Sequence, residues 1–336
     1  MADAAALLIE ACDDPGAVAA RARAEGRRVI RVLGQDAPYA LLRAAGLFPV
    51  RMVPRPGPTP DADALAGDGT LSQRGRSLLQ QIVAEDSGDP LLFTHANSEL
   101  PQLFAAVREL LRTGDIAPRP IHLFDLLHLP RESSRAYNQG RIAALLGWLE
   151  TVTASPFDPA MLQYHAEEER GRAALMHGLS GRTRIAAIGA AHALDPADWR
   201  AAVGDLSGGS AGEPVFVLGS PHYSTARQAE IERSGRIALG DDQDWGDPLV
   251  AGWAGSPLTI AGLADPARLQ PRMLVPVSDR LARIVERMSD LGTRRAVIVE
   301  SEGDEAAAWD AGYFERELRA HGIAVDRIGA PPPPHT

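Results

Sequence analysis

Short apolar runs alternate with stretches of helical spacing along most of the chain. Residues 71–83, 100–111 and 281–291 carry apolar side chains every three or four positions, as an amphipathic helix does. Runs typical of buried strands lie between such stretches, at 27–34, 47–53, 91–93, 119–125, 184–191, 214–220, 236–242, 295–301 and 323–329. Strands alternating with helices in this way predict an α/β fold with parallel sheets.

The alternation is interrupted once, between Glu132 and about Leu179. In this stretch Ile142, Leu145 and Leu149 form a helical stripe, and residues 157–179 predict a second long helix. The sequence therefore predicts two flavodoxin-like parallel-sheet halves with a helical segment between them. The predicted units are an N-terminal α/β domain, a helical segment, a C-terminal α/β domain and a Pro-rich tail, at 1–131, 132–181, 182–330 and 331–336.

Composition and charge narrow the class of partner. The 336 residues are 45% hydrophobic and 23% charged, which is ordinary for a globular protein and enough for more than one core. The formal net charge of −10 argues against nucleic acid or an anionic membrane as the main partner. The chain has no lysine, so chemistry through a lysine Schiff base or a P-loop lysine is excluded.

Cysteine usage and the N-terminal segment favour a cytoplasmic location. Cys12 is the only cysteine, so it cannot form an internal disulfide or a cysteine-ligated metal site. The first residues lack a basic region and carry acids within the apolar stretch, unlike a signal peptide. No apolar run approaches the length of a membrane-spanning helix.

Candidate site residues lie where predicted strands pass into helices. These crossings are 94–98, 219–225 and 301–305, and the carboxyl ends of strands are where open α/β sheets hold ligands. Ser98, Thr225 and Asp304 are predicted to cap the following helices. His95 and His222 lie at two of the crossings and are candidates for an acid or base, although structural histidines are the alternative. The acidic run 241–247 lacks the closing glutamate of a calcium loop and is predicted to be a solvated loop.

The amino-acid sequences of four segments, and their order along the chain, resemble those of a known family. PYALLRAAGLFPVRM, HLPRESSRAYNQGRIAALLGWLE, FVLGSPHYSTARQAEIERSGRIALGDDQDWGD and AVIVESEGDEAAAW with ELRAHGIAVDRI are similar to segments of the 2-hydroxyacyl-CoA dehydratase D-component family, which includes benzoyl-CoA reductase subunits. The resemblance implies two flavodoxin-like halves. It also implies an activity, since typical members bind a [4Fe–4S] cluster through three cysteines and dehydrate 2-hydroxyacyl-CoA, or reduce benzoyl-CoA, by radical chemistry.

This chain departs from the family at the cluster. The three cysteine positions fall near Ser72, Ala96 and Gly303, while Asn97 and Asp304 stand where an aspartate tends to follow the cysteine. None of the three replacements provides a thiolate for iron. We therefore expect no cofactor and no metal in this chain, and no radical chemistry by this chain alone.

Three specific hypotheses follow. A fourth, general alternative is an α/β scaffold that binds an unknown ligand. The chain is a non-redox subunit beside a cysteine-bearing paralogue, or a stand-alone protein, homodimer included, that binds acyl-CoA or another small ligand. The third is an enzyme of non-radical, lyase-like or other chemistry using His95, His222 or Asp304. In each case the predicted ligand cleft lies between the halves, and its residues are Ser72, His95, Ala96, Asn97, Ser98, Ser220, His222, Gly303 and Asp304.

Overall fold

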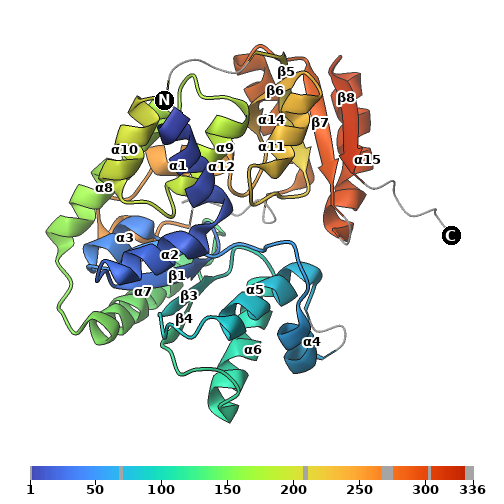
Figure 1. Cartoon of the computed structure of the whole chain (residues 1–336). Coiled ribbons are helices and arrows are strands. Elements are labelled where there is room, and N and C mark those ends of the chain that lie inside the picture. Colours follow the sequence, from blue (N-terminus) through green and yellow to red (C-terminus); the bar gives the residue numbers. More distant parts are fainter. Residues whose placement is uncertain (1, 68–70, 207–210, 267–274, 302–303, 330–336) are drawn as a thin grey trace.

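The computed structural model describes residues 2–67, 71–206, 211–266, 275–301 and 304–329, and it confirms the α/β fold (Figure 1). One parallel sheet has the strand order β2-β1-β3-β4 and the other the order β6-β5-β7-β8. Both orders are the same when each sheet is numbered from its own first strand, and this is the order of a flavodoxin-like half. The strands are β1 Val29–Leu33, β2 Phe48–Arg51, β3 Leu91–Thr94, β4 Ile121–Phe124, β5 Glu213–Gly219, β6 Arg236–Asp241, β7 Arg295–Glu300 and β8 Ala324–Gly329.

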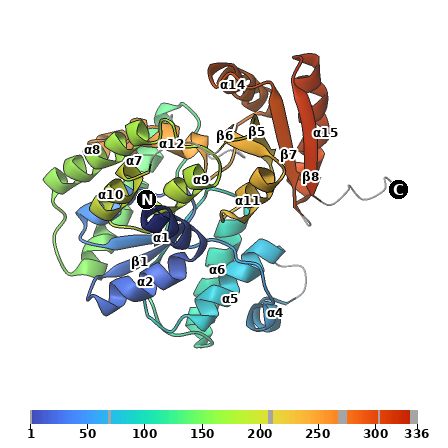
Figure 2. The same cartoon turned by 45° about the horizontal axis from the view of Figure 1, so that its top comes forward.

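Helices cover both faces of each sheet, which explains why the central strands are apolar on both sides. In the second sheet, Phe216 and Ile298 face α14 and α15, whereas Val217 and Val297 face α11. Figure 2 shows α14 and α15 beside the β5–β8 sheet, apart from the larger N-terminal half. The helices are α1 Ala2–Asp13, α2 Pro15–Ala24, α3 Tyr39–Ala44, α4 Pro60–Ala66, α5 Gln73–Ala84, α6 Glu99–Thr113, α7 Glu132–Thr153, α8 Pro159–Leu175, α9 Gly181–Ala190, α10 Pro196–Gly204, α11 Ala226–Arg233, α12 Asp247–Ala254, α13 Ile260–Leu263, α14 Val277–Asp290 and α15 Glu305–Ala320.

The strand predicted at 184–191 is wrong, because these residues belong to helix α9 and its C-terminal end. Every residue from Arg184 to Ala191 is buried, so the run carries no amphipathic pattern. A uniformly apolar run cannot be assigned to strand or helix by periodicity, and here its alanines favour the helix. The other eight predicted strands are present.

The two halves share a core through the first helix. Leu8 and Cys12 of α1 pack with Ile185 and Ile188 of α9, and Trp253 of α12 joins the same cluster. The predicted N-terminal unit is therefore in extensive contact with residues beyond 181, and the domain boundaries stay a prediction. Among the described residues, no helix is both long enough and apolar enough to span a bilayer.

Candidate functional site

The carboxyl ends of the two sheets face one cleft. In each sheet the first strand, β1 or β5, is hydrogen-bonded to neighbours on both sides, so the chain leaves it at the point where the strand order reverses. Gly34 follows β1 with φ of 114°, and Gly219 ends β5 with φ of 103°. A side chain on Gly34 would collide with Thr94, and one on Gly219 with the backbone of Val299. Glycine at both positions lets the neighbouring strand approach closely, next to the point where α/β sheets bind ligands.

The cleft has a volume of about 710 Å³, which is within the range of small-molecule sites. Its N-terminal wall comes from the start of α5 and the β3–α6 crossing. Its C-terminal wall comes from the β5–α11 and β6–α12 loops and the first turns of α15. The lining residues that the argument below uses are Ser72, Arg74, Ala96, Asn97, Ser98, Glu99, Tyr223, Asp244, Trp245, Arg280, Asp304, Glu305 and Asp310.

The structure brings together some of the residues predicted for this site. Ser72, Ala96, Asn97, Ser98 and Asp304 line the cleft. Gly303 lies outside the described residues. His95, Ser220 and His222 are not in the lining.

The three predicted residues outside the lining have other contacts. Ser220 is fully buried, and its hydroxyl accepts a hydrogen bond of 3.0 Å from the Ser301 N–H. The Nε2 atom of His222 lies 3.3 Å from the Gln228 amide nitrogen. The Nδ1 atom of His95 lies 2.9 Å from Asp125 Oδ1, and the Tyr137 hydroxyl donates to the other oxygen of Asp125. Asp125 thereby orients the His95 ring at the edge of the first sheet.

Two of the predicted helix caps are wrong. The Asn97 side-chain oxygen accepts from the N–H groups of Glu99 and Leu100, both at 3.0 Å, while Ser98 makes no cap hydrogen bond. Ser98 and Thr225 both have helical backbone angles, so their hydroxyls are not placed over the free N–H groups. Thr225 instead donates its hydroxyl proton to Asp13.

The caps at Ser72 and Asp304 are formed, and both residues line the cleft. The Ser72 hydroxyl accepts from the Arg74 N–H at 3.1 Å, and the Asp304 carboxylate accepts from the Ala307 N–H at 3.3 Å. The two walls therefore present capped helix starts to the same space.

An ion pair crosses the cleft between these two helix starts. Arg74 Nη2 lies 2.5 Å from Asp304 Oδ2, joining α5 of the first half to the start of α15 in the second. Burial opposes ionisation of Asp304, but the Arg74 pair and hydrogen bonds from Ser220 and Ala307 outweigh it and lower the pKa of this carboxyl. Asp304 is therefore ionised at neutral pH.

The lining is acidic overall. Five carboxylates, Glu99, Asp244, Asp304, Glu305 and Asp310, face the cleft with two arginines, Arg74 and Arg280. Both arginines already have carboxylate partners. Arg74 pairs with Asp304, and the Arg280 guanidinium nitrogens lie 2.7 Å from Asp242 Oδ2 and 2.9 Å from Asp310 Oδ2. A ligand with several negative charges would meet repulsion here without displacing these pairs.

Sequence reasoning named neither the arginines nor the aromatic residues of the lining. Arg74 follows Ser72 by two residues, but its partner lies 230 positions away, and spacing gives no signal for such a pair. Trp245 lies in the acidic run predicted as a solvated loop, yet it is buried under Arg51, whose guanidinium carbon lies 5.0 Å from its ring centre.

The described residues contain no group of three or more His, Cys, Asp and Glu side chains placed to hold a metal ion. Cys12 is buried in the α1–α9 core, and burial raises the pKa of its thiol to about 11. The thiol therefore stays protonated and faces the core rather than the cleft.

The comparisons with known proteins leave the family open. A scan against models of protein families finds none that matches this chain. A search of curated proteins likewise finds no significant match. The fold is established by the strand order, while the ligand site and the resemblance to the dehydratase family stay predictions.

Proposed function

We propose that this chain is a non-redox ligand-binding protein, a cluster-free relative of the 2-hydroxyacyl-CoA dehydratase D-components, whose ligand occupies the cleft between the two sheets. One observation carries the proposal. The residues that follow equivalent strands of both sheets line a single cleft of about 710 Å³, with capped helix starts and a paired arginine and aspartate facing each other across it.

The replacements at the predicted cluster positions support a ligand in place of iron. Ser72 and Ala96 line the cleft, and both are too small to fill the space that a cluster and its thiolates would occupy. Asn97 and Ser98 add an amide and a hydroxyl to the same wall. Such polar groups orient a small organic ligand by hydrogen bonds rather than by metal coordination.

The resemblance favours an acyl-CoA ligand. The charge of the cleft lining indicates which part of the acyl-CoA molecule can bind there. The thioester arm of CoA is neutral, whereas its phosphates are strongly negative. Because the lining arginines are already paired, we propose that the cleft takes the neutral acyl-pantetheine arm and leaves any phosphates outside.

A thermal-shift experiment with matched ligands tests this proposal. Acetyl-CoA and acetyl-pantetheine carry the same thioester and differ in the nucleotide and its phosphates. A ligand that binds only the folded state raises the melting temperature of the protein. Because the acidic lining repels phosphates, acetyl-pantetheine is expected to raise the melting temperature at least as much as acetyl-CoA at equal free concentration. A preference for acetyl-CoA of tenfold or more would contradict the charge argument, and no shift with either would contradict the ligand.

A variant pair locates the binding. Ser98 is exposed in the cleft wall, so Ser98→Trp fills the space with little cost to the core. Ser289→Trp makes the same change on the exposed surface of α14, outside the lining. The thermal shift is expected to vanish in Ser98→Trp and to remain in Ser289→Trp.

A second candidate is the role of a non-redox subunit beside a cysteine-bearing paralogue. The β4–α7 loop and the start of α7 expose Leu127, Leu129 and Tyr137, and Leu129 is 58% exposed. Exposed apolar side chains that lie close together mark interaction surfaces. Light scattering of the purified chain, alone and with the co-expressed paralogue, separates this role from stand-alone binding.

A further inference from the structure

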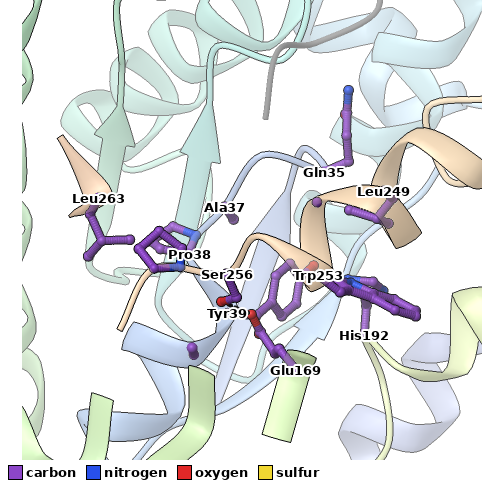
Figure 3. Close-up of a pocket in the computed structure, with 13 residues that line it drawn as sticks. Gln35, Ala37, Pro38, Tyr39, Glu169, His192, Leu249, Trp253, Ser256 and Leu263 are labelled. Atoms are coloured by element: carbon purple, nitrogen blue, oxygen red, sulfur yellow. Dashed lines mark hydrogen bonds between the residues drawn. The ribbon is translucent and has the colours of Figure 1, made fainter. Parts of the chain in front are cut away.

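A second, smaller cavity lies behind the wall of the cleft. It measures about 40 Å³, and its polar lining consists of Gln35, Tyr39, Glu169, His192 and Ser256, with Trp253 as the largest apolar member. Figure 3 shows Tyr39, Glu169 and Ser256 gathered together, Trp253 and His192 beside them, and Gln35 extending away from the group. Gln35 lines the cleft as well. We call this space the inner cavity.

The inner cavity contains a buried hydroxyl whose partner is missing. Tyr39 is only 3% exposed, and its hydroxyl has no hydrogen-bond partner among the described residues. Burying a hydroxyl without a hydrogen bond is unfavourable, so an occupant that bonds it would be stabilising.

Neighbouring groups offer acceptors to the same occupant. The Ser256 hydroxyl donates to Glu169 Oε2 at 2.8 Å, which leaves lone pairs on both residues. His192 is buried, and burial holds its pKa well below the usual value, so the ring is neutral. Its Nδ1 atom lies 3.0 Å from the Ile188 carbonyl and must carry the proton, which leaves Nε2 as an acceptor.

Charge excludes an ionic occupant. Glu169 is the one carboxylate in the lining, and it would repel an anion. Arg43 Nη1 lies 3.7 Å from Glu169 Oε1, so a cation would have to compete with a guanidinium group for this carboxylate. Neither sign of charge can be added to this low-dielectric region without a large cost.

We infer that the inner cavity is a binding site for a neutral hydroxyl group, supplied by a small alcohol or, in its absence, by water. Such a group accepts from the Tyr39 hydroxyl and donates to Glu169 or His192. The volume of about 40 Å³ suits it, since a cavity of roughly 10–15 Å³ already holds one water. This site is separate from the ligand proposed for the cleft, and neither depends on the other.

Indole N–H signals in NMR spectra can detect occupancy directly, because Trp253 lies in the cavity wall and Trp309 is 85% exposed. Methanol is the probe, with methylammonium and formate as charged probes of similar size. Methanol is expected to shift the Trp253 signal saturably while Trp309 moves only in proportion to concentration. A linear response of both signals, or tighter binding of either ion, would overturn the inference.

Removing the Tyr39 hydroxyl supplies the second arm. Tyr39→Phe is expected to fold, because it deletes a buried polar atom that has no protein partner, and to weaken methanol binding about three- to tenfold. Tyr164→Phe removes an exposed hydroxyl from α8 and is expected to leave binding unchanged. Equal methanol affinity in Tyr39→Phe and the wild type would overturn the site.

The source of the hydroxyl is tested without alcohol. A crystal structure of the alcohol-free protein is expected to show water within hydrogen-bonding distance of Tyr39 Oη, and methanol soaking is expected to displace it. An empty cavity in the alcohol-free crystal would overturn the inference.

Discussion

The two sheets share a strand order but differ in the charged side chains that their strands bury. In the first sheet, Arg31 of β1 and Arg51 of β2 are buried within the strands. In the second, the buried part of β5 from Val215 to Leu218 is entirely apolar. The second sheet buries carboxylates at the ends of its strands instead, Asp241 of β6 and Glu300 of β7, whereas the first buries arginines, of which Arg51 joins the halves.

The halves are joined at two places that differ in burial. We call the contacts of Arg51 and Asp13 the base of the cleft, and the Arg74–Asp304 pair its mouth. At the base, the buried Arg51 donates to the carbonyls of Cys12 and Tyr223, and Asp13 accepts from the backbone and hydroxyl of Thr225. At the mouth, the Arg74–Asp304 pair is partly exposed on its arginine side. The base fixes the two sheets relative to each other, and the mouth is the part that a ligand can perturb.

The largest effect is expected from breaking the base. Arg51→Leu leaves the carbonyls of Cys12 and Tyr223 without this donor and is expected to lower the free energy of unfolding by about 3 kcal/mol. Arg21→Leu removes an arginine that is half exposed and forms a surface ion pair with Glu10, and is expected to change stability by less than about 1 kcal/mol. Urea denaturation measures both, and equal effects would contradict the difference between base and surface.

The next largest effects are expected at Gly34 and Gly219, the glycines at the ends of β1 and β5, and they differ between the two halves. Gly219→Ala is expected to cost about 2–3 kcal/mol, because its side chain would meet the backbone of Val299, which cannot move aside. Gly34→Ala meets the Thr94 side chain instead, so adding Thr94→Ala is expected to recover part of the loss. Gly140→Ala in the open middle of α7 is the control and is expected to be neutral or stabilising. A Gly34→Ala loss that Thr94→Ala leaves unchanged would contradict this assignment.

The sequence was sufficient for the fold and for part of the site. Alternating apolar runs located eight strands, since burial on both faces leaves a direct signal in sequence. The same signal failed at α9, where a helix buried on all sides has the pattern of a buried strand. Long-range pairs such as Arg74–Asp304 could not be predicted, because periodicity reports which residues are buried and not which surfaces meet.

A smaller effect distinguishes the predicted helix cap from the observed one. Asn97→Ala removes the oxygen that caps α6 and is expected to cost about 1 kcal/mol of unfolding free energy. Ser98→Ala is expected to cost less than about 0.5 kcal/mol, because Ser98 makes no cap hydrogen bond. The opposite order in thermal or urea unfolding would restore Ser98 as the cap.

The smallest stability effect is expected at the mouth, and it depends on pH. The pKa of Asp304 is lower in the folded protein, so its contribution is present at neutral pH and is lost as pH falls below about 4 and then through the folded pKa. Asp304→Asn is expected to destabilise by at most about 1 kcal/mol at pH 7 and to match the wild type near pH 2. Glu305→Gln makes the same charge change at the exposed neighbouring position and is the control. A deficit for Asp304→Asn that is equal at both pH values would show that the ion pair contributes nothing.

Acetyl-pantetheine binding tests the central claim most directly, because it asks whether the space between the sheets holds a ligand. We expect acetyl-pantetheine to raise the melting temperature of the wild type and of Ser289→Trp, and to leave Ser98→Trp unchanged. A shift that persists in Ser98→Trp would place the ligand elsewhere. The absence of any shift in the wild type with either acetyl-pantetheine or acetyl-CoA would contradict a thioester ligand in the cleft.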